Sequence, residues 1–183
     1  MDFISLVEAR QSTRKFDPEK KVKPEDILFC LEAMRLSPSA SNAQPYFFHV
    51  CEAEKAKQVA KATQSAGLNR FSTDAPVQIV ICEAPYNATA SLGARFRNQD
   101  YRSVDIGIAA IHFVLAAAEK GLGTCMLGWF DEKRIQEILG VSDRIRLVIS
   151  VGYAKDEPLR RKKRKSLDQL TDFIANKEVS SSQ

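Results

Sequence analysis

The sequence predicts one α+β domain that spans residues 1–183, and three observations support this prediction. The chain has 183 residues, 44% hydrophobic and 27% charged, which suits a single domain with a sizeable core. Its periodicity gives the order helices, strand, helix, strand, long helix, strand, helix, strand. No G-x-G-x-x-G motif follows a predicted strand, so a Rossmann dinucleotide domain is not supported. The pattern leaves α+β and three-layer α/β arrangements open.

The first part of the chain predicts three helices and a strand. Residues 2–9 place apolar side chains at helical spacing. A second helix starts at Pro24, which suits a first turn, and ends at Ser37, because a residue before proline avoids the helical conformation. After a polar loop, residues 46–51 predict a strand and residues 54–64 an exposed amphipathic helix.

The middle of the chain contains the strongest apolar pattern. Residues 77–82 are rich in β-branched side chains, which is typical of a buried strand. Residues 84–102 have no clear periodicity and predict loop mixed with short helix. Residues 103–120 are apolar on nearly every face, so we expect a central, buried helix. A short strand follows within residues 121–129.

The C-terminal part predicts a capped helix, a strand and a weakly structured end. Asp131 is the expected N-cap of a helix over residues 131–139, and Gly140 is its expected C-cap. Residues 147–151 predict the last strand. The remaining segments are a weak helix at residues 167–176 and a frayed tail at residues 177–183.

Cysteine usage and the N-terminal composition favour a cytoplasmic protein. The four cysteines are widely spaced, with no C-x-x-C pair, and the chain has only two histidines, so neither a zinc site nor any other metal site is expected. We expect buried, reduced thiols at Cys30, Cys51 and Cys82, which lie in or beside apolar runs. No window approaches 18 uncharged apolar residues and the N-terminus carries early acidic residues, so we expect neither a membrane span nor a signal peptide.

Positive charge is concentrated in one short segment. The formal net charge is +4, and residues 160–165, here called the basic run, contain six consecutive cations, without which the chain would be slightly acidic. A nucleic-acid-binding protein would normally spread such residues over a face with aromatic side chains between them. Nucleic-acid or anionic-membrane binding through the basic run nevertheless stays an alternative function.

Three segments could carry chemistry, and each also has a purely structural interpretation. The RQSTR segment, residues 10–14, offers two forked guanidiniums and a hydroxyl to a phosphate, or it is a solvated helix end. Residues 37–45 form a rigid polar loop between prolines, suited either to the carbonyl and imide edge of a flat heterocycle or to a simple connection. Three glycines within residues 121–128 allow close backbone approach, either to a ligand or to a packed helix.

Together these segments resemble the FMN-dependent nitroreductase family. The matching motifs are R-x-S-x-R, S-P-S-x-x-N-x-Q-P, A-P-V before a strand, D-x-G-x-A, G-L-G-T-C-x-x-G-x-F and a late R-K-S-L, and they extend from about residue 10 to residue 170. The resemblance implies a three-layer sandwich with a central, mostly antiparallel sheet and an intertwined homodimer with FMN at the subunit interface. It also implies ping-pong hydride transfer from NADH or NADPH to a nitroaromatic, quinone or related small electrophilic acceptor.

The same resemblance assigns the cofactor-binding residues, and no side chain is assigned as a catalytic acid or base. The FMN phosphate and ribityl chain would be held by Arg10, Gln11, Ser12 and Arg14. Arg164 and Lys165 would close on the phosphate, while the other four cations of the basic run form a solvated loop. The flavin ring would be lined by Pro38, Ser39, Ala40, Ser41 and Asn42 from the second subunit, and by Asn69, Leu127, Gly128 and Trp129.

One departure from the family pattern and one further function stay open. His112 stands on the long helix where many relatives carry a different pair of residues, and we expect a hydrogen-bonded core histidine there. A flavin-binding storage or sensing protein without turnover is the second alternative function.

Overall fold

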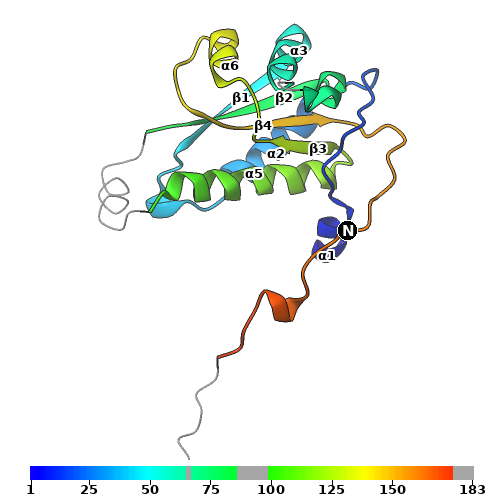
Figure 1. Cartoon of the computed structure of the whole chain (residues 1–183), viewed down its shortest axis with the longest axis vertical. Coiled ribbons are helices and arrows are strands. Elements are labelled where there is room, and N and C mark those ends of the chain that lie inside the picture. The colour runs from blue at the N-terminus through cyan, green and yellow to red at the C-terminus, as the bar shows by residue number, and fades with distance from the viewer. Residues whose placement is uncertain (65–66, 86–98, 175–183) are drawn as a thin grey trace, which may run out of the picture.

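A four-stranded antiparallel sheet forms the centre of the computed structural model, which describes residues 1–64, 67–85 and 99–174 (Figure 1). The strand order is β1-β2-β4-β3, and every neighbouring pair is antiparallel. The strands are β1 (Tyr46–Glu52), β2 (Val77–Glu83), β3 (Gly123–Leu127) and β4 (Ile145–Gly152). The predicted α+β fold with a central antiparallel sheet is therefore confirmed.

Helices cover both faces of the sheet and give three layers. Figure 1 shows α2 and α5 on one face and α3 and α6 on the other. The helices are α1 (Phe3–Ala9), α2 (Pro24–Arg35), α3 (Ala53–Ala62), α5 (Tyr101–Glu119) and α6 (Glu132–Leu139). As predicted, α6 begins after Asp131, whose carboxylate accepts a hydrogen bond from the Arg134 N–H at 3.0 Å, and ends at Gly140, which has φ 71°.

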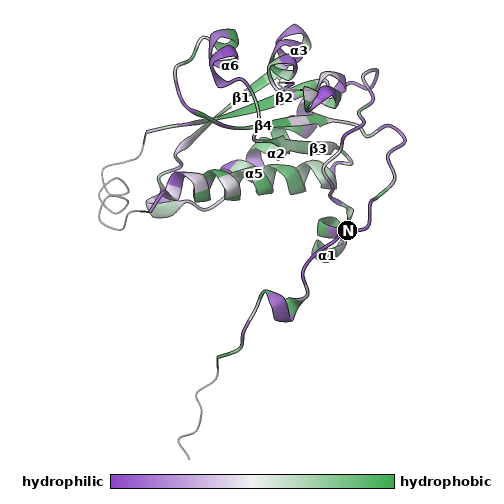
Figure 2. Ribbon diagram, viewed as in Figure 1, coloured by the Kyte–Doolittle hydropathy of each residue, from purple (hydrophilic) through white to green (hydrophobic). Residues whose placement is uncertain are grey.

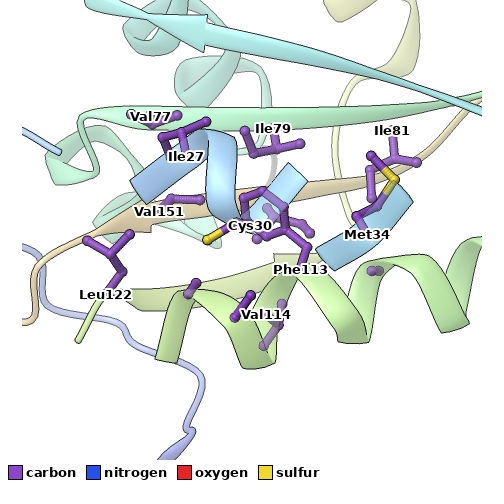
Figure 3. Packing of buried hydrophobic residues seen from close by; sticks show 14 of the residues in the cluster. Ile27, Cys30, Met34, Val77, Ile79, Ile81, Phe113, Val114, Leu122 and Val151 are labelled. Atoms are coloured by element: carbon purple, nitrogen blue, oxygen red, sulfur yellow. The ribbon is translucent and has the colours of Figure 1, made fainter. Parts of the chain in front are cut away.

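Both faces of strand β2 are buried, which explains the continuous apolar run at residues 77–82. Ile79 and Ile81 face α2 and α5, where they pack in the same cluster as Phe113 (Figure 3). Val80 and Cys82 face the opposite layer and join the cluster beneath α3 and α6. The alternation of side chains along a strand thus supplies two cores from one sequence segment.

The long helix α5 is a core helix as expected, but only one of its faces is buried within the described residues. Eight of its residues are buried, mainly against the sheet and α2. Val104, Ile108, Ile111 and Leu115 recur at helical spacing on another face and are half-buried or exposed. Figure 2 shows α5 as a largely apolar helix. The helix is long and apolar enough to cross a membrane, but its buried face makes it a core helix of this fold. His112 lies half-buried on it, and its Nδ1 bonds the Ile108 carbonyl at 2.8 Å, as expected for a hydrogen-bonded histidine.

The C-terminal segment differs from the predicted weak helix. Only a short 3₁₀ turn, Leu167–Gln169, forms there, and residues 170–174 are not helical. Phe173 and Ile174 are more than 90% exposed, so within the described residues no packed apolar face stabilises a helix at this point. The rest of that predicted helix, the frayed tail and most of residues 84–102 lie outside the described residues.

Candidate functional site: a cationic groove beside strand β3

The RQSTR segment lies along the start of β3 because a glycine there leaves room for it. Ser12 forms a parallel bridge with Thr124, and the Thr13 N–H donates to the Thr124 carbonyl at 2.8 Å. Thr13 is 2% exposed, and a Cβ at Gly123 would lie 2.5 Å from its Oγ1. The glycines after α5 therefore serve close packing at Gly123, and this packing fixes the segment that was predicted to bind phosphate.

The chain before and within the basic run packs against the RQSTR segment from the other side. The Gln11 amide Nε2 donates to the Pro158 carbonyl at 3.3 Å, and its Oε1 accepts from the Arg160 N–H at 3.1 Å. The Arg160 guanidinium bonds the Ser12 carbonyl and, at 2.6 Å, the carboxylate of Glu157. The bonds to Gln11 and Ser12 join residues 147 to 149 positions apart in the sequence.

Lys162 is the second anchored cation of the basic run. Its Nζ donates to the carbonyls of Glu8 and Arg10, both at 2.7 Å. The expectation that all four cations before Arg164 form a solvated loop is therefore wrong for Arg160 and Lys162. In an extended segment alternate residues point the same way, which accounts for two inward cations at spacing two.

These contacts build a groove of about 300 Å³ that we call the cationic groove. Its nine lining residues are Arg10, Gln11, Ser12, Arg14, Arg160, Arg161, Lys162, Lys163 and Arg164. Seven of them are Arg or Lys, and partial desolvation followed by the charges of Arg10 and Arg164 lowers the pKa of Lys162. A phosphate monoester, with a charge of about −1.5 to −2 at pH 7, complements such a set of donors. Lys165 is not among the lining residues, and its predicted phosphate contact stays a prediction.

A second group of predicted site residues lies at the end of β3. The side-chain amide of Asn69 donates to the Trp129 carbonyl at 3.3 Å and to the Thr63 carbonyl at 3.1 Å. Trp129 is 59% exposed, whereas the Leu127 side chain is 4% exposed in the core, so only the backbone of Leu127 can meet a ligand. Gly128 lies four positions after Thr124, about 13 Å along an extended strand, so β3 connects the two groups.

The third group, residues 38–42, lies at the opposite end of α5. The Ala40 N–H donates to Asp105 Oδ1 at 3.0 Å, near the start of this helix. Arg10 and Gln11, by contrast, share a small concavity with Ala118 at its end. From residue 105 to residue 118 a helix rises about 20 Å. Within one chain, the predicted ring-binding residues and the predicted phosphate-binding residues therefore lie at opposite ends of α5, about 20 Å apart.

Two carboxylates in this arrangement were missed from the sequence. Glu157 accepts from the Arg14 N–H at 3.0 Å as well as from Arg160, and no local sequence signal marks it. Asp105 is 2% exposed on α5. Its signal was a single acidic residue inside an apolar helical pattern, since a buried carboxylate needs a specific partner.

A three-layer sandwich around an antiparallel sheet, with a groove lined by seven cations at one sheet edge, suits a protein that binds an anionic cofactor. The chain matches the Nitroreductase family over residues 7–153 and belongs to it. It is 26% identical to the Bacillus subtilis protein named "Putative NAD(P)H nitroreductase YdgI", over 85% of this chain and 90% of the relative. A nitroreductase family protein of Streptococcus pneumoniae TIGR4 superposes with a TM-score of 0.79 at 26% identity, over 94% of this chain and all of the other. An FMN-dependent nitroreductase of Clostridium difficile R20291 gives a TM-score of 0.73 at 26% identity, over 94% and 99% of the two chains.

Proposed function

We propose that the protein is an FMN-dependent NAD(P)H oxidoreductase that reduces a nitroaromatic, a quinone or a related small electrophile. Family membership and relatives named as NAD(P)H and FMN-dependent nitroreductases make it an oxidoreductase that uses FMN and NAD(P)H. The observation that carries the proposal in this chain is the cationic groove, whose seven Arg and Lys side chains fit the FMN phosphate. Bound FMN supplies the hydride chemistry, and the protein supplies binding and orientation.

The residues of this chain act on the cofactor through position and charge. Arg10, Arg14 and Arg164 offer forked donors to the phosphate, with Ser12 as a further donor at the groove wall. The backbone after β3, held by Asn69, offers amide groups to the flavin ring without needing a specific side chain at Leu127. Reductant and acceptor would use one pocket by turns, which gives ping-pong kinetics.

We further propose a homodimer in which each FMN is held by both subunits. Its first support is the separation of about 20 Å between the cationic groove and residues 38–42 along α5. Its second support is the apolar stripe on α5 that the single chain leaves uncovered. A two-fold arrangement of antiparallel α5 helices brings residues 38–42 of one subunit to the groove of the other.

Further apolar side chains support the same dimer. Phe3 and Ile4 of α1 are 66% and 64% exposed, and Leu170 and Phe173 of the C-terminal segment are 62% and 94% exposed. Figure 1 shows that this C-terminal segment extends away from the sheet, past α1. An exposed apolar set of this kind marks an interaction surface rather than a monomer surface.

The cysteines and the basic run support a proposal about where the protein acts. We propose a cytoplasmic enzyme that binds neither nucleic acid nor membranes. All four cysteines are buried and free, which suits a reducing compartment. Arg160 and Lys162 donate hydrogen bonds to carbonyls of the chain itself, which leaves fewer donors in the basic run for the phosphates of a polyanion.

The decisive experiment is an absorbance spectrum of the purified protein, followed by anaerobic addition of NADH and of NADPH. We expect a yellow protein whose flavin bleaches with at least one reductant, and parallel double-reciprocal plots when an acceptor is varied. A yellow protein that neither reductant bleaches supports storage or sensing. A colourless protein with salt-dependent nucleic-acid binding supports the basic-run alternative.

The dimer has its own test by sedimentation. We expect a particle near twice the chain mass of 20.4 kDa. Ile108→Glu places a charge in the apolar stripe and should give a monomer that has lost FMN, whereas Lys57→Glu on the far layer should leave the dimer intact. A monomer that keeps FMN would contradict the shared site.

A further inference from the structure

A buried carboxylate joins the 38–44 loop (residues 38–44) to the core helix α5. Asp105 is 2% exposed, and its Oδ1 accepts the Ala40 N–H at 3.0 Å. Its Oδ2 is also buried and meets no donor within residues 1–64, 67–85 and 99–174. Internal packing alone does not account for a charged group in this position, because a buried charge is unfavourable unless donors surround it.

The loop that Asp105 holds is unusually strained. Ser41, Asn42 and Gln44 have φ of 52°, 50° and 46°, a left-handed conformation that non-glycine residues rarely adopt. Such a conformation persists only where the surroundings impose it, and it concentrates at ligand-binding sites.

Most of the bonds within this loop are local. The Gln44 N–H donates to Ser39 Oγ at 3.0 Å, and the Gln44 side-chain amide donates to the Asn42 carbonyl at 3.2 Å. These bonds fix the shape of the loop but not its place relative to the rest of the chain. The bond from Ala40 to Asp105 connects residues 65 positions apart and supplies that placement.

We propose that Asp105 is the positioning residue of the flavin site: through Ala40 it holds the strained 38–44 loop in the conformation that receives the flavin ring. This inference rests on the proposed function, since it assumes that the loop meets FMN. Without the bond, the loop populates other conformations, and FMN binding must first restore the competent one. The apparent dissociation constant then rises by the inverse of the competent fraction.

The bond can be removed from either side. Asp105→Ala deletes the acceptor. Ala40→Pro deletes the donor, and the backbone favours proline there: Ser39 is extended at φ −144° and ψ 158°, and Ala40 is the first residue of a short helical turn. Asp100→Asn is the matched control, because it removes an exposed carboxylate just before α5 without touching the loop.

The experiment measures the FMN dissociation constant by fluorescence titration for the wild type, both single variants, the double variant and Asp100→Asn. We expect each single variant to raise the constant about tenfold, the double variant to add little more, and the control to stay within about twofold. At saturating FMN the visible spectrum of the bound flavin should shift in both single variants but not in Asp100→Asn, a readout that a general loss of stability would not move.

Several results would overturn the proposal. Wild-type affinity in Ala40→Pro does so even where Asp105→Ala fails to fold. Additive losses in the double variant, or an equal loss in Asp100→Asn, also do so. If the wild type itself binds no FMN, the proposed function fails instead, so the two failures are distinguishable.

Discussion

The two ends of helix α5 carry parts of the candidate site that are built on opposite principles. At its C-terminal end, the cationic groove is formed by relaxed, well-bonded backbone that carries an excess of charge. At its N-terminal end, the 38–44 loop carries no charge of its own and contains three non-glycine residues in the left-handed conformation. Repulsion between like charges destabilises the groove until an anion binds there. In the loop, the left-handed backbone conformation is the source of the unfavourable free energy.

The two ends of α5 should therefore respond differently to salt and to mutation. Charge acts over several ångströms and is screened by salt, so the groove should tolerate small displacements but not loss of cations. A strained loop works through position, so it should tolerate salt but not loss of its anchoring bonds.

Removal of both RQSTR arginines should have the largest effect. In the double variant Arg10→Ala, Arg14→Ala we expect the FMN dissociation constant to rise at least about 100-fold, because each charge-assisted contact contributes roughly 1.5–3 kcal/mol. The wild-type constant should rise with salt, and the variant should show a weaker salt dependence. Arg35→Ala, on a surface ion pair of α2, is the control. Unchanged flavin occupancy in the double variant would remove the basis of the phosphate assignment.

Gly123→Ala should show that the groove depends on packing beneath it. The added Cβ would lie 2.5 Å from Thr13 Oγ1 and 2.9 Å from Thr13 Cβ, so the RQSTR segment must shift. We expect the free energy of unfolding to fall by about 1–3 kcal/mol, and FMN affinity to fall with it. At Gly128 an added Cβ meets nothing within 4 Å, so Gly128→Ala should leave denaturant unfolding nearly unchanged. Equal stability of the two variants would mean that β3 can move freely.

Arg164→Ala and Arg160→Ala should separate charge from anchoring within the groove. Arg164 bonds only its neighbour's carbonyl among the hydrogen bonds seen in the described residues, so its loss should weaken FMN about tenfold without lowering the melting temperature. Arg160 also bonds Glu157 and the Ser12 carbonyl, so its loss should lower both the FMN affinity and the melting temperature. Titration and thermal melting of both variants give the answer. Identical behaviour would show that anchoring is unimportant here.

Ser41→Gly should produce the smallest change, and in the opposite direction. Glycine adopts φ near 52° without steric cost, so we expect the FMN-free protein to gain about 0.5–1 kcal/mol, which raises the melting temperature by about 1–4 °C. Ser39→Gly is the control, because Ser39 is extended and its hydroxyl accepts from the Gln44 N–H. A gain in Ser39→Gly as large as that in Ser41→Gly would contradict the presence of strain at residue 41.

Most elements of the fold were predictable because their signals are local. Apolar spacing predicted the five helices and four strands of the described residues to within a few positions, and Asp131 and Gly140 were identified as caps from their chemistry alone. The prediction of a weak C-terminal helix was wrong, because apolar periodicity does not show whether another part of the protein packs against the helix. Within the described residues, Phe173 meets none.

The kinds of side chain and loop that make up the candidate site were also predictable from the sequence. Two arginines around a hydroxyl, a polar loop between prolines and a glycine-rich turn before an edge strand were evident without any coordinates. The burial of Cys30, Cys51 and Cys82 followed from the apolar runs around them. Desolvation by that burial raises the thiol pKa, to about 12 for Cys30 and to about 11 for Cys51 and Cys82.

Only the tertiary structure decided which of these residues act together. It turned Arg160 and Lys162 toward the RQSTR segment, and it brought Asp105 to Ala40 across 65 positions of sequence. It also placed the loop and the groove at opposite ends of one helix. Local propensities depend on neighbours in the chain, whereas these pairings depend on how layers of helices pack on the sheet, and no short stretch of sequence encodes that packing.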